Sequence, residues 1–307
     1  MKGREDFAAE ALRAGDLVIL PTETVYGLAA DAANASAVAR LYEAKGRPRF
    51  NPLIAHLADA DGAARVAHLD ARALRLAEAF WPGPLTIVAP VRDEAAVCDL
   101  ARAGLETVAV RVPAHPMARA LLAAFGGPLV APSANRSGRP SPTTFADAVA
   151  ETGASAATAL DGGSCQVGLE STVVALLDGA PRLLRPGAVT RDQIEALIGA
   201  LAEAEADARR SPGRMARHYA PTAPMRLDAA APEPGEAFLA FGPAPETVGV
   251  FNLSPGGSLS EAAVHLFAYL RAADALAPTA IAVAPIPDHD LGEAINDRLR
   301  RAAGFIG

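Results

Sequence analysis

The sequence predicts an α/β protein with two domains, the first built on a mixed, twisted sheet with flanking helices and the second smaller. Three observations predict this class. Short apolar runs rich in β-branched residues alternate with stretches of helical periodicity, as strands and helices packed in layers do. A cation-rich segment without apolar periodicity, residues 209–221, interrupts this alternation. The length of 307 residues also exceeds the roughly 100–200 residues of an ordinary domain.

The first predicted strands are short apolar runs in the first half of the chain. They are LVILPT from Leu17, PLIAHL from Pro52, LTIVAPV from Leu85, TVAVRVP from Thr107 and PLVAPSA from Pro128. Because these runs are almost continuously apolar, we expect strands that are covered on both faces of the sheet. STVVALLD from Ser171 and PRLLRPG from Pro181 flank a turn at 178–180 and predict a hairpin, so the sheet should be mixed.

Helices are predicted from the residues that start them. Asn34, Asp70 and Thr143 each precede a helical pattern and are suited to cap it. Thr190 and Gln193 have the spacing of a capping box, which predicts a helix over residues 190–206. We expect that helix to close the first domain.

The predicted first domain covers residues 5–195, and a linker covers 196–222. Beyond the linker, a smaller α/β domain is predicted over 223–307, because the alternation of strands and helices resumes there. Its strands begin at Met225, Ala237, Val248 and Ala280, and its helices lie near 260–273 and 296–301.

Composition excludes several classes of protein. Hydrophobic residues make up 51% of the chain and charged residues 21%, which is typical of a globular protein. The apolar stretches fall far below the roughly 20 residues that span a bilayer, and the first residues lack the pattern of a secretory signal, so we expect a cytoplasmic protein. Cys98 and Cys165 lie outside any C-x-x-C pattern, and no metal site is predicted. The net charge of −7 argues against nucleic-acid binding by the whole surface but allows a local basic pocket.

Polar residues gather where predicted strands end, which is where α/β proteins place ligand sites. Neither a P-loop nor a G-x-G-x-x-G motif is present, so a nucleotide would be held differently. The segment 21–27, PTETVYG, is either a polar turn or part of a site. Lys45, Arg47 and Arg49 place three cations between a helix and a strand. Bound phosphate would relieve their repulsion, although such a run is more often a solvated face.

Other candidate groups follow along the chain. His56 lies within a predicted strand, where a histidine is more often structural than a ligand. Thr107 and Arg111 are four residues apart on one strand and therefore face the same side. An arginine in an apolar strand is costly unless paired, so Arg111 meets either a carboxylate of the protein or one of a ligand, and we weigh these equally. The loop 131–138, the segment 168–172 and Arg185 add hydroxyl, amide and cationic groups.

Taken together, seven segments resemble, in order, the YrdC/Sua5 family of L-threonylcarbamoyladenylate synthases. They are PTETVYGL, KGRPRFNPLIAH, FWPGPLT, VAVRVP, APSANRSGRPSPT, GLESTVV and LLRPGAV. Further on, SPGRMARHYAPTAPMRL resembles the linker of the two-domain Sua5 type, although the family pattern is closer to SPGMKYRHYAP. The resemblance implies a YrdC-like catalytic domain followed by a Rossmann-like Sua5 domain.

The resemblance also implies an activity. It is that of a nucleotidyltransferase that makes threonylcarbamoyl-AMP and pyrophosphate from L-threonine, bicarbonate and ATP, for the t6A modification of tRNA. Mg²⁺ would accompany ATP, without a tightly bound cofactor. The product would pass to a tRNA threonylcarbamoyltransferase complex, with no stable tRNA binding and no membrane association by this chain.

Site residues are implied by position in the matching motifs. Lys45 and Arg47 match the catalytic cations that neutralise the triphosphate. The threonine site is matched by Thr24, His56, Arg111, Ala131 and Ser171, with Ala131 acting through its backbone. The nucleotide site is matched by Arg47, Asn51, Thr107, Ser133, Ser141, Arg185 and Tyr219, the last from the linker.

Two alternatives stay open. One is an RNA-binding or ribosome-assembly factor with a basic concave surface, which would favour aromatic stacking platforms, yet only 5% of the residues are aromatic. The other is a carbamoyltransferase component, which would carry acylphosphatase-like and zinc-finger-like segments that this sequence lacks. Both rank below the synthase.

Overall fold

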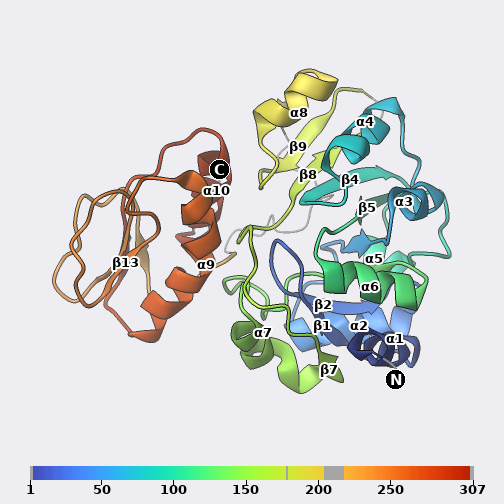
Figure 1. Ribbon diagram of the computed structural model, residues 1–307, viewed down its shortest axis with the longest axis horizontal. Helices are drawn as coiled ribbons and strands as arrows, with labels where there is room; N and C mark the ends of the chain where they lie inside the picture. Colours follow the sequence, from blue (N-terminus) through green and yellow to red (C-terminus); the bar gives the residue numbers. More distant parts are fainter. Residues whose placement is uncertain (1–2, 178, 204–217, 305–307) are drawn as a thin grey trace.

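The computed structural model describes residues 3–177, 179–203 and 218–304, which form two sheets, each with its own helices. In Figure 1, helices α9 (Leu259–Ala275) and α10 (Leu291–Ala302) of the C-terminal part lie between its sheet and the larger domain. The predicted α/β class with a second, smaller α/β domain is confirmed. The exact domain boundaries stay a prediction, since the linker residues 204–217 lie outside the described part of the chain.

The larger sheet contains ten strands within the described residues, in the order β10-β9-β8-β4-β5-β3-β6-β2-β1-β7. The strands are β1 Val18–Leu20, β2 Gly27–Asp31, β3 Ile54–His56, β4 Leu85–Pro90, β5 Thr107–Arg111, β6 Leu129–Val130, β7 Thr158–Ala159, β8 Thr172–Ala175, β9 Arg182–Arg185 and β10 Ala202–Glu203. Strand β5 pairs parallel with β3 and antiparallel with β4, so the sheet is mixed as predicted. β8 and β9 form the predicted hairpin, although Asp178 of its turn lies outside the described residues.

Within the described residues, the larger domain has eight α-helices, three of which begin at predicted caps. The eight helices are α1 Arg4–Arg13, α2 Ala35–Lys45, α3 Ala60–Val66, α4 Ala71–Phe80, α5 Asp99–Arg102, α6 Pro116–Phe125, α7 Phe145–Thr152 and α8 Arg191–Ile198. The Asn34 side chain accepts hydrogen bonds from the first turn of α2, and Asp70 does the same for α4. Thr190 and Gln193 form the capping box of α8. These caps are confirmed.

Two helix predictions are wrong in detail. Helix α7 is capped by Thr144 and not by Thr143, because the Thr144 hydroxyl is the one that accepts a hydrogen bond from the Asp147 amide. Helix α8 ends at Ile198 and does not reach residue 206. Gly199 adopts a φ of 84°, which ends the helix, and the chain continues into strand β10.

Strand β2 was not predicted from the sequence. Its residues, GLAAD, have low strand propensity, and the segment 21–27 was expected to be either a polar turn or part of a site. In the structure, β2 pairs antiparallel with both β1 and β6, so its partners determine its conformation. The chain therefore turns back after β1, so that β2 runs antiparallel beside it, and residues 21–26 form the loop between these two strands.

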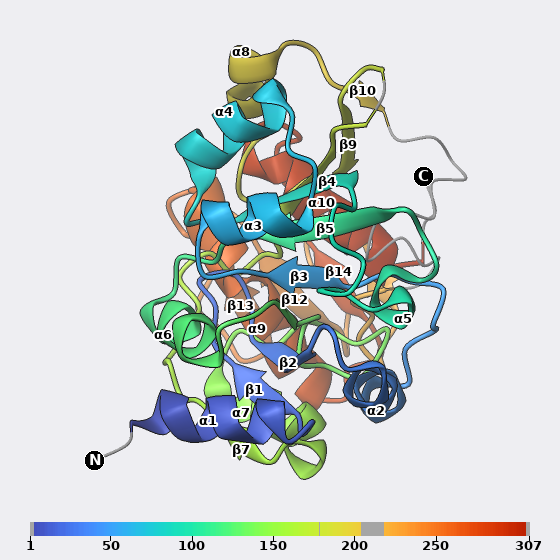
Figure 2. The same ribbon diagram turned by 90° about the vertical axis from the view of Figure 1, so that its right-hand side faces the viewer.

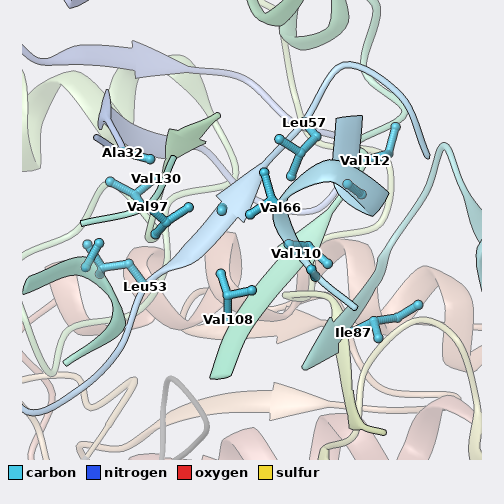
Figure 3. Close-up of a cluster of buried hydrophobic side chains, with 14 of the residues drawn as sticks. Ala32, Leu53, Leu57, Val66, Ile87, Val97, Val108, Val110, Val112 and Val130 are labelled. Atoms are coloured by element: carbon cyan, nitrogen blue, oxygen red, sulfur yellow. The ribbon is translucent and has the colours of Figure 1, made fainter. Parts of the chain in front are cut away.

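The two faces of the larger sheet have different surroundings. Figure 2 shows helices α3, α4 and α6 in front of the face turned away from the C-terminal domain. Val108 and Val110 of β5, and Val112 directly after it, belong to the main core on that side (Figure 3). Ala109 instead packs with Ile54 of β3 in a small separate cluster, because alternate residues of a strand face opposite sides. Arg111 and His56 follow the same alternation and share this second face.

The C-terminal domain is a parallel sheet with two helices. Its four strands, counted within the described residues, lie in the order β11-β14-β12-β13 and all pair in parallel. They are β11 Met225–Arg226, β12 Ala237–Ala240, β13 Val250–Asn252 and β14 Ile281–Val283. Val25 and Leu169 of the larger domain join the hydrophobic cluster of this domain, so the two domains share apolar packing. No helix in the described part of the chain has the length and apolar character that a bilayer crossing demands.

Candidate functional site

A cavity of about 50 Å³ lies on the sheet face that carries His56 and Arg111. Strand ends, loops and the start of the described segment after the linker contribute its walls. The lining residues are Thr24, Val25, Arg47, Pro52, Leu53, Ile54, His56, Arg111, Ala131, Pro132, Ser133, Glu170, Ser171, Arg185, His218 and Tyr219. Every residue predicted for the threonine site is in this lining. Of the predicted nucleotide residues, the lining includes Arg47, Ser133, Arg185 and Tyr219.

Arg111 is paired by a carboxylate of the protein. Its Nη2 lies 2.6 Å from Oε1 of Glu23, and both side chains are buried. The second oxygen of Glu23 accepts hydrogen bonds from the amides of Ala114 and His115 at 3.0 and 3.3 Å. Burial raises the pKa of Glu23, but the charge and hydrogen bond of Arg111 outweigh it and leave that pKa below its ordinary value. Glu23 therefore stays ionised and fixes the guanidinium.

His56 is a neutral group in this site. It is almost completely buried on β3, and its Nδ1 lies 3.1 Å from the carbonyl oxygen of Ile54. Burial, followed by the charge of Arg111, lowers the pKa of His56 to about 3. Its ring is therefore uncharged near neutral pH and serves as a polar wall.

The predicted cation cluster separates into two kinds of residue. Lys45 and Arg47 are buried, whereas Arg49 is exposed. Lys45 ends helix α2, and its Nζ donates to the backbone carbonyls of Ser133 and Asn135, so it braces the 133–135 loop from behind the lining. Burial, with the nearby charge of Arg47, holds the pKa of Lys45 well below its usual value.

Arg47 reaches the cavity itself. Its Nη2 donates to the Pro52 carbonyl at 3.2 Å, and burial lowers its pKa to about 10. The group is still protonated near neutral pH. Arg185 lies at the end of β9 and donates to the carbonyl of Ser171 at 2.9 Å. The cavity therefore carries two buried guanidinium groups besides Arg111.

Glu170 is a lining carboxylate that the sequence reasoning missed. One oxygen accepts a hydrogen bond from the Ser141 hydroxyl, and the other lies 3.0 Å from Nε of Arg298 on α10. Burial raises the pKa of Glu170, but the charges of Arg298 and Arg185 and the bond from Ser141 leave it lowered. The signal available in the sequence was its place in GLEST, directly before the predicted site residue Ser171.

Four predicted residues lie outside the lining. Lys45, Asn51 and Ser141 lie behind it, since each is buried and tied to elements that form the wall. Thr107 is different, because it starts β5, pairs with Pro90 and stands about 13 Å along the strand from Arg111. Thr107 and Arg111 face the same side of the sheet, as predicted, but they lie at opposite ends of β5.

The described segment after the linker fills one side of the cavity. Tyr219 is 1% exposed, has a φ of 63° and packs its ring 5.4 Å from that of Phe267 on α9. His218 lies edge-on against it with ring centroids 4.0 Å apart. Burial and four nearby cations, Arg47, Lys45, Arg185 and Arg298, hold the pKa of His218 well below its ordinary value. Positive charge is therefore concentrated here, as an anion site requires.

Two sequence-family profiles match the chain. One, described as "Telomere recombination" and covering Sua5, YciO and YrdC proteins, matches residues 10–187. The other, described as "Threonylcarbamoyl-AMP synthase, C-terminal domain", matches residues 189–304.

Named relatives match over nearly the whole chain. The threonylcarbamoyl-AMP synthase of Bacillus subtilis is 40% identical over 97% of this chain and 92% of its own length. That of Pyrococcus abyssi is 38% identical over 97% of this chain and 93% of its own. A crystal structure of P. abyssi Sua5 complexed with L-threonine matches with a TM-score of 0.90 at 37% identity, covering 98% of this chain and 94% of the other.

Proposed function

The chain belongs to the Sua5/YrdC family of threonylcarbamoyl-AMP synthases, and on that premise we propose that it converts L-threonine, bicarbonate and ATP into threonylcarbamoyl-AMP and pyrophosphate. It is thus an enzyme, and we propose a nucleotidyltransferase. The observation that supports this most is the concentration of buried cations around one cavity in a protein of net charge −7. Such charges are costly to bury unless an anion joins them.

The threonine end of the site is proposed to lie around Arg111 and His56. The P. abyssi relative has been solved with L-threonine, which supports L-threonine as a substrate of this chain. Arg111 would attract the substrate carboxylate while Glu23 keeps the guanidinium in place. Thr24, Ala131 and Ser171 line the same cavity and offer hydroxyl and backbone groups.

The nucleotide end is proposed to lie around Arg47 and Arg185. Both are buried, and both present planar forks that suit phosphate oxygens. Lys45 adds charge from behind and holds the loop that carries Ser133. Asn51 has a buried side-chain oxygen without a partner in the described part of the chain, which a ligand donor would satisfy.

Mg²⁺ is proposed to arrive on the triphosphate. Glu170 is the one carboxylate among the described lining residues, and Arg298 and Ser141 already occupy it. The described residues contain no group of three or more acidic, histidine or cysteine side chains that could hold a metal ion. Mg²⁺ commonly keeps its waters and binds phosphates with few protein ligands, and when bound it would neutralise phosphate charge.

The reaction needs no nucleophile from the protein. Bicarbonate yields CO₂ and hydroxide. The threonine amine adds to the CO₂ and loses a proton, which converts the hydroxide to water, and the product is a carbamate. A carbamate oxygen then attacks the α-phosphorus of ATP, forming the new O–P bond as pyrophosphate leaves. The protein's residues would hold the two substrates together and stabilise the charge that develops, which is how most phosphoryl-type transfers are accelerated.

Substrate entry is proposed to require movement of the 218–221 segment. The present cavity of about 50 Å³ is far below the several hundred cubic ångströms of a typical ligand pocket. His218 and Tyr219 belong to its lining and are themselves buried. Displacing these two rings is the simplest way to make room for a nucleotide.

The product is proposed to serve the t6A modification of tRNA through a separate tRNA threonylcarbamoyltransferase complex. Stable tRNA binding by this chain is not expected, and a cytoplasmic location stays a prediction from the sequence.

Pyrophosphate release from ATP tests the proposed function. We expect release with Mg²⁺ only when both L-threonine and bicarbonate are present, and at background when either is left out or when D-threonine replaces the L form. Release that is independent of threonine, or absent with all substrates, would reject it. Tight, salt-sensitive RNA binding without this turnover would instead favour an RNA-binding factor.

A further inference from the structure

Arg298 of the C-terminal domain is buried against Glu170, a residue that lines the cavity of the other domain. Its side chain is 1% exposed although it belongs to helix α10, whose neighbouring Arg300 is 54% exposed. A fully buried guanidinium is costly unless its donors are satisfied. The hydrogen-bond and ion-pair partners of Arg298 therefore show which parts of the protein its buried side chain connects.

The partners of Arg298 come from the larger domain as well as its own. Nε lies 3.0 Å from Oε2 of Glu170, and Nη1 donates to the carbonyl of Pro186 at 2.8 Å. Nη1 also lies 2.8 Å from Asp297 on the same helix. Pro186 directly follows Arg185, and Glu170 directly precedes Ser171. One side chain thus ties together the two segments that carry Arg185 and Ser171.

Glu170 connects Arg298 to the cavity, because Glu170 is one of the lining residues. Its other oxygen accepts from the Ser141 hydroxyl, so Arg298, Glu170 and Ser141 form a continuous buried chain. Without Arg298, the carboxylate would turn toward Arg185, the other cation whose charge lowers the pKa of Glu170. That would withdraw Arg185 from the anion it is proposed to bind.

Arg298 also restrains Tyr219. The guanidinium carbon lies 5.4 Å from the centre of the Tyr219 ring, within the range of a cation–π contact. The Tyr219 hydroxyl and Nη2 of Arg298 are both buried without a partner in the part of the chain that the structure describes. Two such groups beside a cavity are unfavourable unless a ligand or water satisfies them.

A backbone contact holds α9, which packs against α10, close to the segment that leads to Glu170. Gly168, with a φ of +77°, lies so close to helix α9 that an added Cβ would be 2.3 Å from the Ala263 carbonyl oxygen. No side chain separates the segment that leads to Glu170 from the C-terminal domain. The placement of Arg298 is therefore fixed by packing between the domains.

We propose that Arg298 is a positioning residue of the synthase site, through which the C-terminal domain holds Glu170, Arg185 and Tyr219 in the arrangement that binds ATP. This rests on the proposed function. The threonine end has its own restraint, the Glu23–Arg111 pair, which Arg298 does not touch. Ser171 of the threonine end is tied to Arg298 only through its neighbour Glu170, so the effect of Arg298 should fall mainly on the nucleotide.

Arg298→Met tests the proposal by steady-state pyrophosphate release with each substrate varied in turn. We expect the KM for ATP to rise about tenfold or more, because a buried carboxylate loses its partner, while the KM for threonine changes less than about twofold. Arg298→Lys keeps a charge but not the planar fork, so the KM for ATP should rise less than in Arg298→Met and remain the one affected.

Glu293→Gln is the matched control. Glu293 is on the same helix and forms another ion pair with the larger domain, to Arg191 at 2.7 Å, but this pair is partly exposed and outside the cavity lining. Loss of that pair loosens docking without touching Glu170 or Tyr219. We expect wild-type KM values for both substrates.

The outcomes separate the two claims. A wild-type enzyme without threonine-dependent pyrophosphate release rejects the proposed function. An active wild type in which Arg298→Met raises both KM values equally, or matches Glu293→Gln, rejects the positioning role. If Arg298→Met does not yield folded protein, Arg298→Lys decides in the same way, since a selective rise in the KM for ATP supports the role and any other pattern rejects it.

Discussion

At the scale of single residues, the site divides into two charged groups with separate supports. Glu23 holds Arg111 on one side, and Arg298 with Glu170 borders Arg185 on the other. The sequence predicted Arg111 and Arg185 for the site, but not Arg298 and neither carboxylate. Arg111 and Glu23 are 88 positions apart, and a pairing of that range leaves no periodic signal in a sequence.

Arg47→Ala and Arg111→Ala should affect different substrates. We expect Arg47→Ala to raise the KM for ATP and Arg111→Ala to raise the KM for threonine, each by about tenfold or more, because a buried charge-assisted contact is lost. Arg49→Ala is the matched control for Arg47, since Arg49 belongs to the same loop but is exposed. Equal losses for both substrates in each variant would contradict the division into two subsites.

His56 makes stability depend on pH in a defined window. Its folded pKa of about 3 lies below the ordinary value of 6.5, so the unfolded chain takes up a proton first as the pH falls. The free energy of unfolding should therefore decrease from pH 6.5 toward pH 3, by on the order of 1 kcal/mol per pH unit from this residue.

The measurement is chemical denaturation of the wild type and His56→Gln at several pH values without substrates. His218 has the same direction of shift and stays in both proteins, so the difference between their slopes isolates His56. Parallel curves across this window would show that His56 is not held neutral.

At the scale of elements, the sequence predicted helix caps correctly but missed strands that are specified by their neighbours in the sheet. The caps at Asn34, Asp70 and Thr190 were correct because a cap depends only on the next three residues. Strand β2 and the two-residue strands β7 and β10 were missed, because their neighbours in the sheet and not their own residues specify them. The predicted helix over 190–206 was too long, because it did not take into account that Gly199 ends α8.

Gly168→Ala should separate the C-terminal helices from the cavity wall. The new Cβ would meet the backbone of α9 at 2.3 Å, so the domains must shift apart. Gly163→Ala is the matched control, because Gly163 has a similar φ of +75° but no atom within 4 Å of an added Cβ. Both variants carry the left-handed strain of about 1–2 kcal/mol.

We expect Gly168→Ala to lower the thermal unfolding midpoint more than Gly163→Ala does, and to raise the KM for ATP as well. The KM for ATP should stay near wild type in Gly163→Ala. If the two variants behave alike, close packing of α9 on the 168–170 segment is not what supports the site.

At the scale of the whole molecule, the sequence predicted two α/β domains but not how they meet. Figure 1 shows both C-terminal helices turned toward the larger domain, and residues of each contact it, including Arg298 from α10 and Arg271 from α9. Arg271 lies 2.9 Å from Glu151 on α7 and also donates to the Pro140 carbonyl. The C-terminal domain thereby contacts two loops of the site, which explains why a second domain accompanies this cavity.

The most direct test of the central claim is identification of the nucleotide product. The wild-type enzyme is incubated with ATP, L-threonine and ¹³C-bicarbonate, and the nucleotides are analysed by mass spectrometry. We predict an AMP adduct with the mass of threonylcarbamoyl-AMP that carries the bicarbonate label and forms in step with pyrophosphate. Pyrophosphate released with AMP alone, or an adduct without the label, would contradict the account.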